Sequence, residues 1–146
     1  PTIVDDGFAL SESLAINLYL AKTYGAGSLY PSTPQGEAQA LCWTVWAQGH
    51  LEPWVQQDAL LANLRAAMGE TARAVVEHGL GLLDRMLDDR AWLVGDGFSV
   101  ADLNVACVLS PSRTARLDLS PFGCVHDWLA RCYARPAAVA TRTRFA

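Results

Sequence analysis

Apolar side chains recur along this chain at two spacings, one typical of strands and one typical of helices. The first ten residues hold two short β-prone runs, Thr2–Val4 and Phe8–Leu10, around the sequence Asp5-Asp6-Gly7. Glycine tolerates the positive φ of a tight turn, so this pattern predicts a hairpin. Two strands alone are marginal in water, and we expect them to need a further sheet or a helical layer.

Beyond the hairpin, apolar positions repeat every three or four residues, which is the spacing of amphipathic helices. Ser11 has the residue type of an N-cap, and Thr33 followed by Pro34 predicts a second helix start. The expected helices run from Ser11 to about Gly25, from Pro34 to about Pro53, from Thr71 to Asp89, from Ser99 to about Leu109, from Ser120 to Tyr133 and, briefly, from Arg135.

The helix expected at 71–89 is apolar enough to be central. Its two glycines, Gly79 and Gly81, cost helix propensity, and the close approach of a neighbouring helix would explain them. Pro53 should kink or end the helix before it. Residues 56–68 fit either a helix or a connecting segment, and Trp92–Val94 is expected to be a short extended segment.

Ser99 and Asp102 have the spacing of a capping box. The Ser99 hydroxyl can accept from the amide of Asp102, and the Asp102 carboxylate can accept from the amide of Ser99. Phe98 and Leu103 occupy the positions of a hydrophobic staple at the same helix start. A carboxylate beside a hydroxyl also suits catalysis, but this spacing favours a structural role.

Composition narrows the class of protein. The chain has 146 residues, 51% of them hydrophobic, and a net charge of −4. That length suits one well-buried domain, and the acidic balance without a basic block disfavours binding to nucleic acid. No apolar run approaches the length that spans a bilayer, and no signal-peptide pattern opens the chain. We therefore expect a soluble, mostly helical protein.

The cysteines and histidines form no metal-binding pattern. The four cysteines, Cys42, Cys107, Cys124 and Cys132, include no C-x-x-C pair, so no metal site is expected. We interpret them as small core residues in a reducing compartment, which favours the cytoplasm.

The three histidines lie far apart in the sequence. His78 is expected on an exposed helix face, and His126 is expected to point away from Asp127, its neighbour in the sequence. His50 lies close in sequence to Trp46 and Trp54, where it could line a cleft or serve only as a structural residue.

Six stretches spread over essentially the whole chain carry a family pattern: Pro1–Val4, Asp6-Gly7, Glu12–Ile16, Phe98–Asp102, Trp128–Arg131 and Arg135–Ala137. The first three resemble the end of the thioredoxin-like domain of glutathione S-transferases, where a cis-proline opens a strand and Glu/Gln-Ser-x-Ala-Ile begins a helix. The others resemble the capping box and the usual tail of that family's all-helical C-terminal domain, and all six follow the family's order.

The resemblance implies a mainly α fold. Residues 1–25 would be a ββα remnant of the thioredoxin-like domain, residues 26–34 a linker, and residues 35–146 a helical bundle. The family's catalytic Tyr, Ser or Cys would precede Pro1. Apolar surface should then be exposed where the rest of the sheet would pack.

The resemblance also implies a function. It indicates a cytoplasmic, homodimeric glutathione S-transferase that joins the thiolate of glutathione to a hydrophobic electrophile in detoxification, with no metal and with neither nucleic acid nor membrane as a partner. The alternative is a non-catalytic dimerisation or protein-interaction module of the same fold.

The family pattern makes Pro1, Glu12 and Ser13 the candidate glutathione-binding residues. The γ-glutamyl group has a carboxylate, which suits a helix N-terminus and the Ser13 hydroxyl, and an ammonium, which suits Glu12. The alternative is that Ser11, Glu12 and Ser13 only cap the helix.

In the family, the helix from Pro34 faces both the dimer partner and the pocket for the hydrophobic co-substrate. Trp46, His50 and Trp54 are the candidate residues of that pocket, since aromatic side chains suit an apolar electrophile. Ordinary packing of these side chains in the core and at the interface is the alternative.

Overall fold

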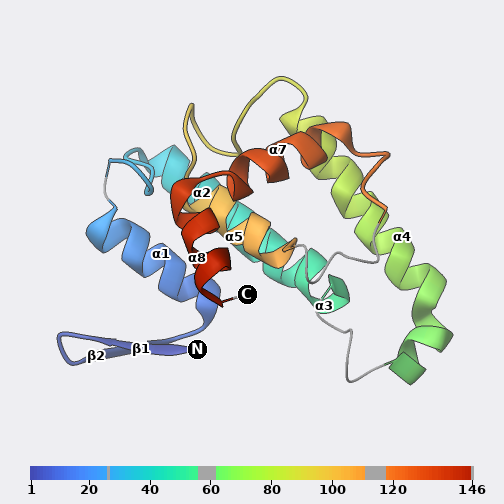
Figure 1. Ribbon diagram of the computed structural model, residues 1–146, viewed down its shortest axis with the longest axis horizontal. Coiled ribbons are helices and arrows are strands. Elements are labelled where there is room, and N and C mark those ends of the chain that lie inside the picture. Colours follow the sequence, from blue (N-terminus) through green and yellow to red (C-terminus); the bar gives the residue numbers. More distant parts are fainter. Residues whose placement is uncertain (26, 56–61, 111–117, 146) are drawn as a thin grey trace.

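The computed structural model describes residues 1–25, 27–55, 62–110 and 118–145. A two-stranded hairpin precedes a set of helices, and it lies at one end of the molecule beneath α1 (Figure 1). The elements are β1 (Thr2–Asp5), β2 (Phe8–Ser11), α1 (Ser13–Tyr24), α2 (Pro34–Trp46), the π-helix η1 (Ala47–Leu51), α3 (Glu52–Val55), α4 (Ala62–Leu87), α5 (Val100–Val108), α7 (Gly123–Tyr133) and α8 (Pro136–Phe145).

The predicted hairpin is confirmed, and each of its strands extends one residue further at its C-terminal end than expected. Asp6 and Gly7 form its two-residue turn with φ of 45° and 83°, values that match the twist of the paired strands. The last pair joins Thr2 to Ser11, whose hydroxyl oxygens lie 3.0 Å apart. Ser11 is therefore a strand residue, and its prediction as the N-cap of the first helix is wrong.

Helix α5 lies at the centre of the fold and contacts α1, α2, η1 and α7. Its Val100 and Val105 are fully buried, and the neighbouring helices contribute Leu51, Leu83 and Trp128 to the same core. On α7, Val125, Trp128, Leu129 and Cys132 form a buried stripe. The core thus belongs to the helices, and the hairpin lies outside it.

The helix from Pro34 does not end at Pro53. Residues 47–51 widen into a π-helical turn, after which α3 continues through Pro53 to Val55. Proline cannot donate to the carbonyl four residues earlier and its ring clashes with that group. A wider turn just before Pro53 relieves this conflict, so the chain changes its helix type instead of stopping.

Helix α4 begins at Ala62, nine residues before the start expected at Thr71. Residues 62–68 of the ambiguous stretch are therefore helical, while 56–61 lie outside the described residues. A Cβ on Gly79 would lie 2.9 Å from Cδ2 of Leu51 in η1. The predicted close approach of a neighbouring helix is thus confirmed at Gly79.

Two further boundaries differ from the expectation. Trp92–Val94 forms bends and no strand. Helix α7 starts at Gly123 and not at Ser120, because the preceding residues close a separate turn. In that turn the amide of Ser120 donates to the Asp118 carboxylate at 3.0 Å, and the amide of Phe122 donates to the Leu119 carbonyl at 3.0 Å.

The cysteines do not all lie in the core. Cys132 is buried and Cys124 is half-buried, but Cys42 and Cys107 are exposed. The prediction of small core residues is wrong for these two, because α2 and α5 each turn one side to solvent at that position. None of the four forms a disulfide.

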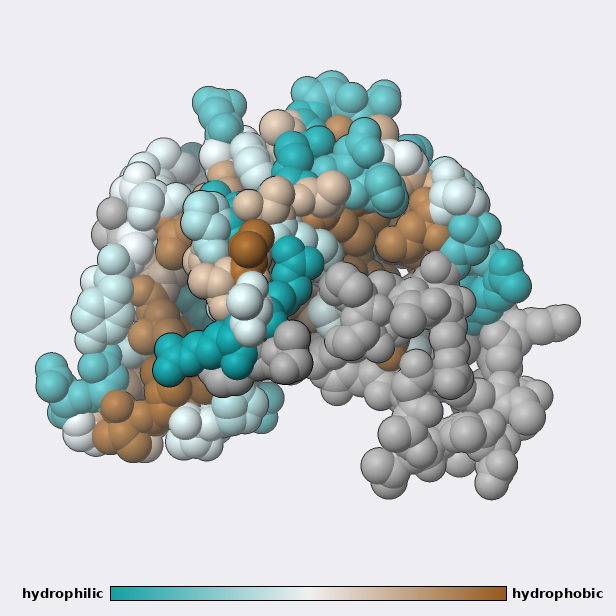
Figure 2. Space-filling view, in the orientation of Figure 1, coloured by the Kyte–Doolittle hydropathy of each residue, from teal (hydrophilic) through white to brown (hydrophobic). Residues whose placement is uncertain are grey.

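Apolar surface is exposed over the hairpin, at the lower left of Figure 2, where Val4 and Phe8 are 71% and 52% exposed. On α2, Leu41 and Val45 are likewise 53% and 59% exposed. Among the described residues, no helix combines the length and apolar character needed to cross a membrane.

Candidate functional site

Glu12 and Ser13 lie where β2 passes into α1. Ser13 is the first residue of α1, and the carbonyl of Glu12 accepts the first helical hydrogen bond from the amide of Ile16 at 2.8 Å. Both side chains are exposed, and neither has a hydrogen-bond partner within the described part of the chain. No side chain accepts from the amides of the first turn. This helix start therefore keeps its donors available.

Glu12 has a backbone conformation that side chains rarely adopt, with φ at 75° and ψ at 113°. A residue of this kind stores about 1–3 kcal/mol of strain and is found most often at functional sites. The Glu12 carboxylate makes no capping hydrogen bond to α1. An exposed carboxylate and an open, positively polarised helix end thus lie side by side.

The hairpin brings Pro1 to the same place. Thr2 pairs with Ser11 at the open end of the hairpin. The next residue beyond this pair is Pro1 on one strand and Glu12 on the other. Pro1 is exposed, as are Glu12 and Ser13. The three candidate glutathione-binding residues therefore gather at the base of the hairpin, where the chain enters α1.

A second contact, which the sequence analysis missed, fixes the other end of the hairpin on α1. The Asp5 carboxylate accepts from the hydroxyl of Tyr19 at 2.8 Å and from that of Tyr24 at 2.6 and 2.8 Å. The Tyr24 bond and then the Tyr19 bond lower the pKa of Asp5. The two tyrosines lie far from Asp5 in sequence, so only the tertiary fold reveals this cluster.

Three aromatic side chains form a row on α2 and η1. The rings of Trp43 and Trp46 meet edge to face at 5.2 Å, and Trp46 stacks on His50 at 6.4 Å. Trp54 on α3 packs against the core like Trp43 and Trp46, but within the described residues no ring contact joins it to the row. His50 is exposed, so the row presents one accessible end to solvent. The structure thus brings Trp46 and His50 together and leaves both packing and ligand contact open as roles.

Among the described residues, no hydrogen bond or ring contact joins this aromatic row to Glu12 and Ser13. What links their two helices is Asn104, a fully buried side chain on α5. Its Oδ1 accepts from Asn17 of α1 at 2.8 Å, and its Nδ2 donates to Thr44 of α2 at 2.9 Å and to the Leu14 carbonyl at 3.4 Å. The one signal in the sequence is an asparagine among the apolar residues that follow the capping box of α5.

The capping box of Ser99 and Asp102 is confirmed. Asp102 is fully buried, and its carboxylate accepts from four donors at 2.9–3.1 Å. These are the amides of Leu93 and Ser99, the Ser99 hydroxyl and the Trp128 indole. A carboxylate surrounded in this way has no free face for a substrate, so its role is to hold the 91–99 segment, α5 and α7 together.

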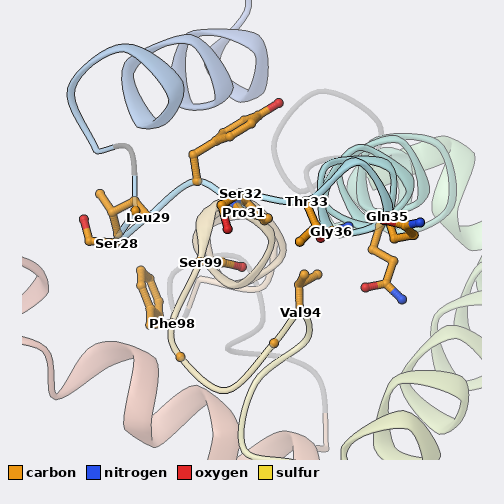
Figure 3. Close-up of a pocket in the computed structure, with 15 residues that line it drawn as sticks. Ser28, Leu29, Pro31, Ser32, Thr33, Gln35, Gly36, Val94, Phe98 and Ser99 are labelled. Atoms are coloured by element: carbon orange, nitrogen blue, oxygen red, sulfur yellow. Dashed lines mark hydrogen bonds between the residues drawn. The ribbon is translucent and has the colours of Figure 1, made fainter.

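A cavity of about 450 Å³ lies between residues 27–39 and the 94–99 loop (Figure 3). Ser32, Thr33 and Gln35 line one wall, and Val94 and Phe98 line the other. Of the predicted site residues, the lining includes only Ser99. This cavity is therefore separate from both candidate groups described above.

The remaining histidines are on the surface. His78 is exposed as expected. His126 does contact Asp127, with Nδ1 and the carboxylate oxygen 3.2 Å apart, so the prediction that the two point apart is wrong. The side chains of His126 and Asp127 are both exposed, and both are long enough to meet above the helix surface. Within the described residues, no three His, Cys, Asp or Glu side chains gather as a metal site would require.

Comparison with known families and curated proteins identifies similar chains. A family model of the glutathione S-transferase C-terminal domain matches residues 47–136. Elongation factor 1-gamma of Danio rerio is 33% identical over 139 residues, and that of Homo sapiens is 35% identical over 109 residues. These alignments cover 90% and 72% of this chain but only 30% and 24% of the relatives. The chain spans less than a third of their length.

Solved structures of glutathione transferases share the fold. One is Ure2p5 of Phanerochaete chrysosporium, cocrystallized with 1-(S-glutathionyl)-2,4-dinitrobenzene. It superposes with a TM-score of 0.85 at 21% identity, and the alignment covers 99% of this chain and 73% of the Ure2p5 chain. A glutathione S-transferase of Xanthobacter autotrophicus gives 0.80 at 29% identity, covering 93% and 68%. The predicted fold, a helical C-terminal domain preceded by a short hairpin and helix, is confirmed.

Proposed function

Because the chain belongs to the family of glutathione S-transferase C-terminal domains, we propose that it forms part of a glutathione transferase and binds the γ-glutamyl end of glutathione. The observation on which this rests is the helix start at Glu12 and Ser13. Within the described residues, its carboxylate and hydroxyl lack hydrogen-bond partners, and the Glu12 side chain does not cap the amides of the first turn. They have the charges that a γ-glutamyl zwitterion would complement.

In this proposal, each residue has a distinct task. The amides of the α1 first turn and the Ser13 hydroxyl would donate to the γ-glutamyl carboxylate, and Glu12 would accept from the ammonium group. Pro1, opposite Glu12 at the base of the hairpin, would contact the middle of the tripeptide. The strain at Glu12 supports this assignment, because strained residues of this kind cluster at functional sites and its carboxylate does not cap the helix.

The reaction would be nucleophilic attack by the glutathione thiolate. Its sulfur forms a bond to an electrophilic carbon, and the displaced group leaves with the bonding electrons. Trp46, His50 and Trp54 would hold the apolar body of the electrophile. The residues assigned here bind the two substrates, and none of them is assigned to activate the thiol.

We also propose the division of the chain into a ββα unit at 1–25, a linker at 26–34 and a helical domain at 35–146, in a cytoplasmic homodimer. The fold supports the first boundary, since α1 ends at Tyr24. A Cβ on the C-cap residue Gly25 would lie 2.9 Å from both the Ala21 carbonyl oxygen and Cβ of Leu29. The sharp change of direction there needs this glycine.

Calorimetric titration of the chain with glutathione tests the proposal. We expect Ser13→Ala and Glu12→Gln each to weaken binding by about tenfold or more, because a hydrogen bond to a charged group contributes roughly 1.5–3 kcal/mol. Ser11→Ala is the matched control, since it removes a neighbouring hydroxyl that bonds Thr2 across the hairpin. γ-Glutamylcysteine should bind and cysteinylglycine should not. Equal affinity in Glu12→Gln and the unaltered chain would contradict the proposal.

The second candidate is a non-catalytic dimerisation or protein-interaction module. It is supported by the similarity to elongation factor 1-gamma and by the exposed Leu41 and Val45 on α2. This candidate would be favoured if the chain did not bind glutathione but self-associated in analytical ultracentrifugation. Leu41→Asp with Val45→Asp should then separate the copies.

A further inference from the structure

The end of the described chain is basic, although the protein as a whole is acidic. The net charge is −4, yet the last acidic residue is Asp127. Four arginines follow it, at positions 131, 135, 142 and 144. Positive charge is thus concentrated on the end of α7 and on α8.

Two of these arginines lie over aromatic rings that touch one another. The guanidinium carbon of Arg131 is 5.9 Å from the centroid of the Trp92 ring, and that of Arg135 is 3.9 Å from the centroid of Phe98. Trp92 and Phe98 meet edge to face at 5.5 Å. The four side chains therefore form one continuous row between the end of α7 and the segment before α5.

The positions of both guanidinium groups are restrained without any acidic partner. Arg131 donates to the Ala91 carbonyl at 3.2 Å, and Arg135 makes no hydrogen bond within the described residues. Neither forms an ion pair there. Two of the protein's acidic groups, one of them a helical turn before Arg131 on α7, have other partners. Asp127 bonds His126, and Asp102 is buried among its own four donors.

A guanidinium stacked on a ring keeps its N–H edges free, and these edges match the geometry of a carboxylate. Stacking also restricts the side chain before any ligand arrives, which lowers the entropy cost of binding. The half-buried faces of Trp92 and Phe98 lie beside the charges, so apolar side chains between the acids of a ligand would find contacts as well.

We propose that Arg131 and Arg135, supported by Trp92 and Phe98, form a docking surface for an acidic segment of a partner protein. A short peptide fits better than a nucleic acid. A long polyanion would extend beyond this row over a protein whose remaining charge is strongly negative, which would repel it. A short acidic segment would not need to extend beyond the row.

Titration of the chain with a short Glu/Ala peptide, followed by NMR of the tryptophan indole N–H signals, tests this proposal. We expect saturable binding that shifts the Trp92 signal and leaves that of Trp43 in place. The double variant Arg131→Gln, Arg135→Gln should bind roughly tenfold or more weakly. The matched control is Lys22→Gln with Arg73→Gln, which removes two exposed charges that pair with Glu37 and Glu77.

A second variant separates binding from folding. Arg131→Lys with Arg135→Lys keeps the charges but loses the forked donors, and it should also bind the peptide more weakly while it melts like the unaltered chain. Equal binding by the arginine variants and the control would overturn the proposal. So would equal binding of a Gln/Ala peptide, or tighter binding of a single-stranded oligonucleotide. Glutathione binding should be the same in all these variants.

Discussion

Asp102 shows how one carboxylate can organise three parts of the chain. It bonds Leu93 in the loop, Ser99 at the start of α5 and the indole of Trp128 on α7. Because every donor around it is buried with it, losing the acceptor leaves each of them without a partner. The effect of a substitution should therefore exceed that of an ordinary helix cap.

We expect Asp102→Ala to lower the free energy of unfolding by about 3 kcal/mol or more. Urea denaturation followed by circular dichroism measures this. Asp96→Ala, an exposed position of the same loop, is the control and should stay within about 0.5 kcal/mol of the unaltered chain. If Asp102→Ala cut glutathione binding at an unchanged melting temperature, the structural role would be refuted.

Asp5 predicts a pH dependence confined to the hairpin. The hydroxyls of Tyr24 and Tyr19 lower its pKa in the folded state, so its contribution to stability is complete above the ordinary carboxyl pKa. That contribution is lost as the pH falls through the lower, folded value. The same bonds raise the pKa of both tyrosines, so their contribution disappears as the pH rises through the alkaline range.

Amide exchange in β1 and β2, measured by NMR against pH, tests this. Protection of the hairpin should fall at acidic pH in the unaltered chain. In Tyr24→Phe the fall should begin at a higher pH, because the largest cause of the lowered Asp5 pKa is gone. An unchanged acid profile in Tyr24→Phe would show that the hydroxyl does not hold Asp5.

At the scale of elements, the contact between α4 and η1 is tight enough to select glycine. Gly79 faces Leu51 of η1, which is itself fully buried and has little room to move. Gly81, two residues later, faces Arg85 and Phe122 at 3.6 and 3.8 Å, which are ordinary contact distances. Two glycines of one helix thus differ in what a methyl group would meet.

Gly81→Ala should therefore stabilise the protein by about 0.5–1 kcal/mol, the gain in helix propensity. Gly79→Ala should destabilise it by about 1 kcal/mol, since overpacking outweighs the same gain. Thermal melts of the two variants, each the control for the other, check this. Equal stabilisation by both would mean that η1 yields easily.

Local sequence signals predicted the helices and strands well where no tertiary interaction competes with them. Thr33 and Pro34 mark the start of α2, and Thr33 accepts from the Gly36 amide at 3.1 Å as an N-cap should. Ser11 failed because strand pairing with Thr2 outweighed its capping propensity. Pro53 does perturb the helix, but a π-helical turn before it accommodates the proline, so the helix continues. No local sequence pattern indicates such a turn.

At the scale of the whole molecule, Asn104 joins α1 to the helical core. It bonds Asn17 and the Leu14 carbonyl of α1 on one side and Thr44 of α2 on the other. Thr44 in turn donates to the Ala40 carbonyl at 2.8 Å. The position of the α1 start, and with it of Glu12 and Ser13, thus depends on a side chain in the centre of the bundle.

We expect Asn104→Ala to lower the free energy of unfolding by about 2–3 kcal/mol and to raise amide exchange in α1 more than in α7. Hydrogen exchange with mass spectrometry checks both parts. Asn17→Ala removes one of the three bonds and should have a smaller effect of about 1 kcal/mol. Uniform loss of protection in both helices would contradict the coupling.

The candidate site was predictable only in part. Glu12 and Ser13 follow from a short motif, because the site is built from one helix start and adjacent residues. The partners of Asp5, Asn104 and Arg135 come from distant segments, so no spacing in the sequence indicates them. The exposure of Cys42 and Cys107 was missed for the same reason, since the outward face of a helix depends on its neighbours.

Cys132 provides an internal reporter of how often α7 separates from the core. Burial raises the pKa of its thiol to about 12, so the closed protein holds almost no reactive thiolate at neutral pH. A thiol reagent can modify it only in molecules where α7 has opened, whereas exposed Cys42 reacts directly. The ratio of the two labelling rates therefore measures the free energy of the opening, local or global, that exposes Cys132.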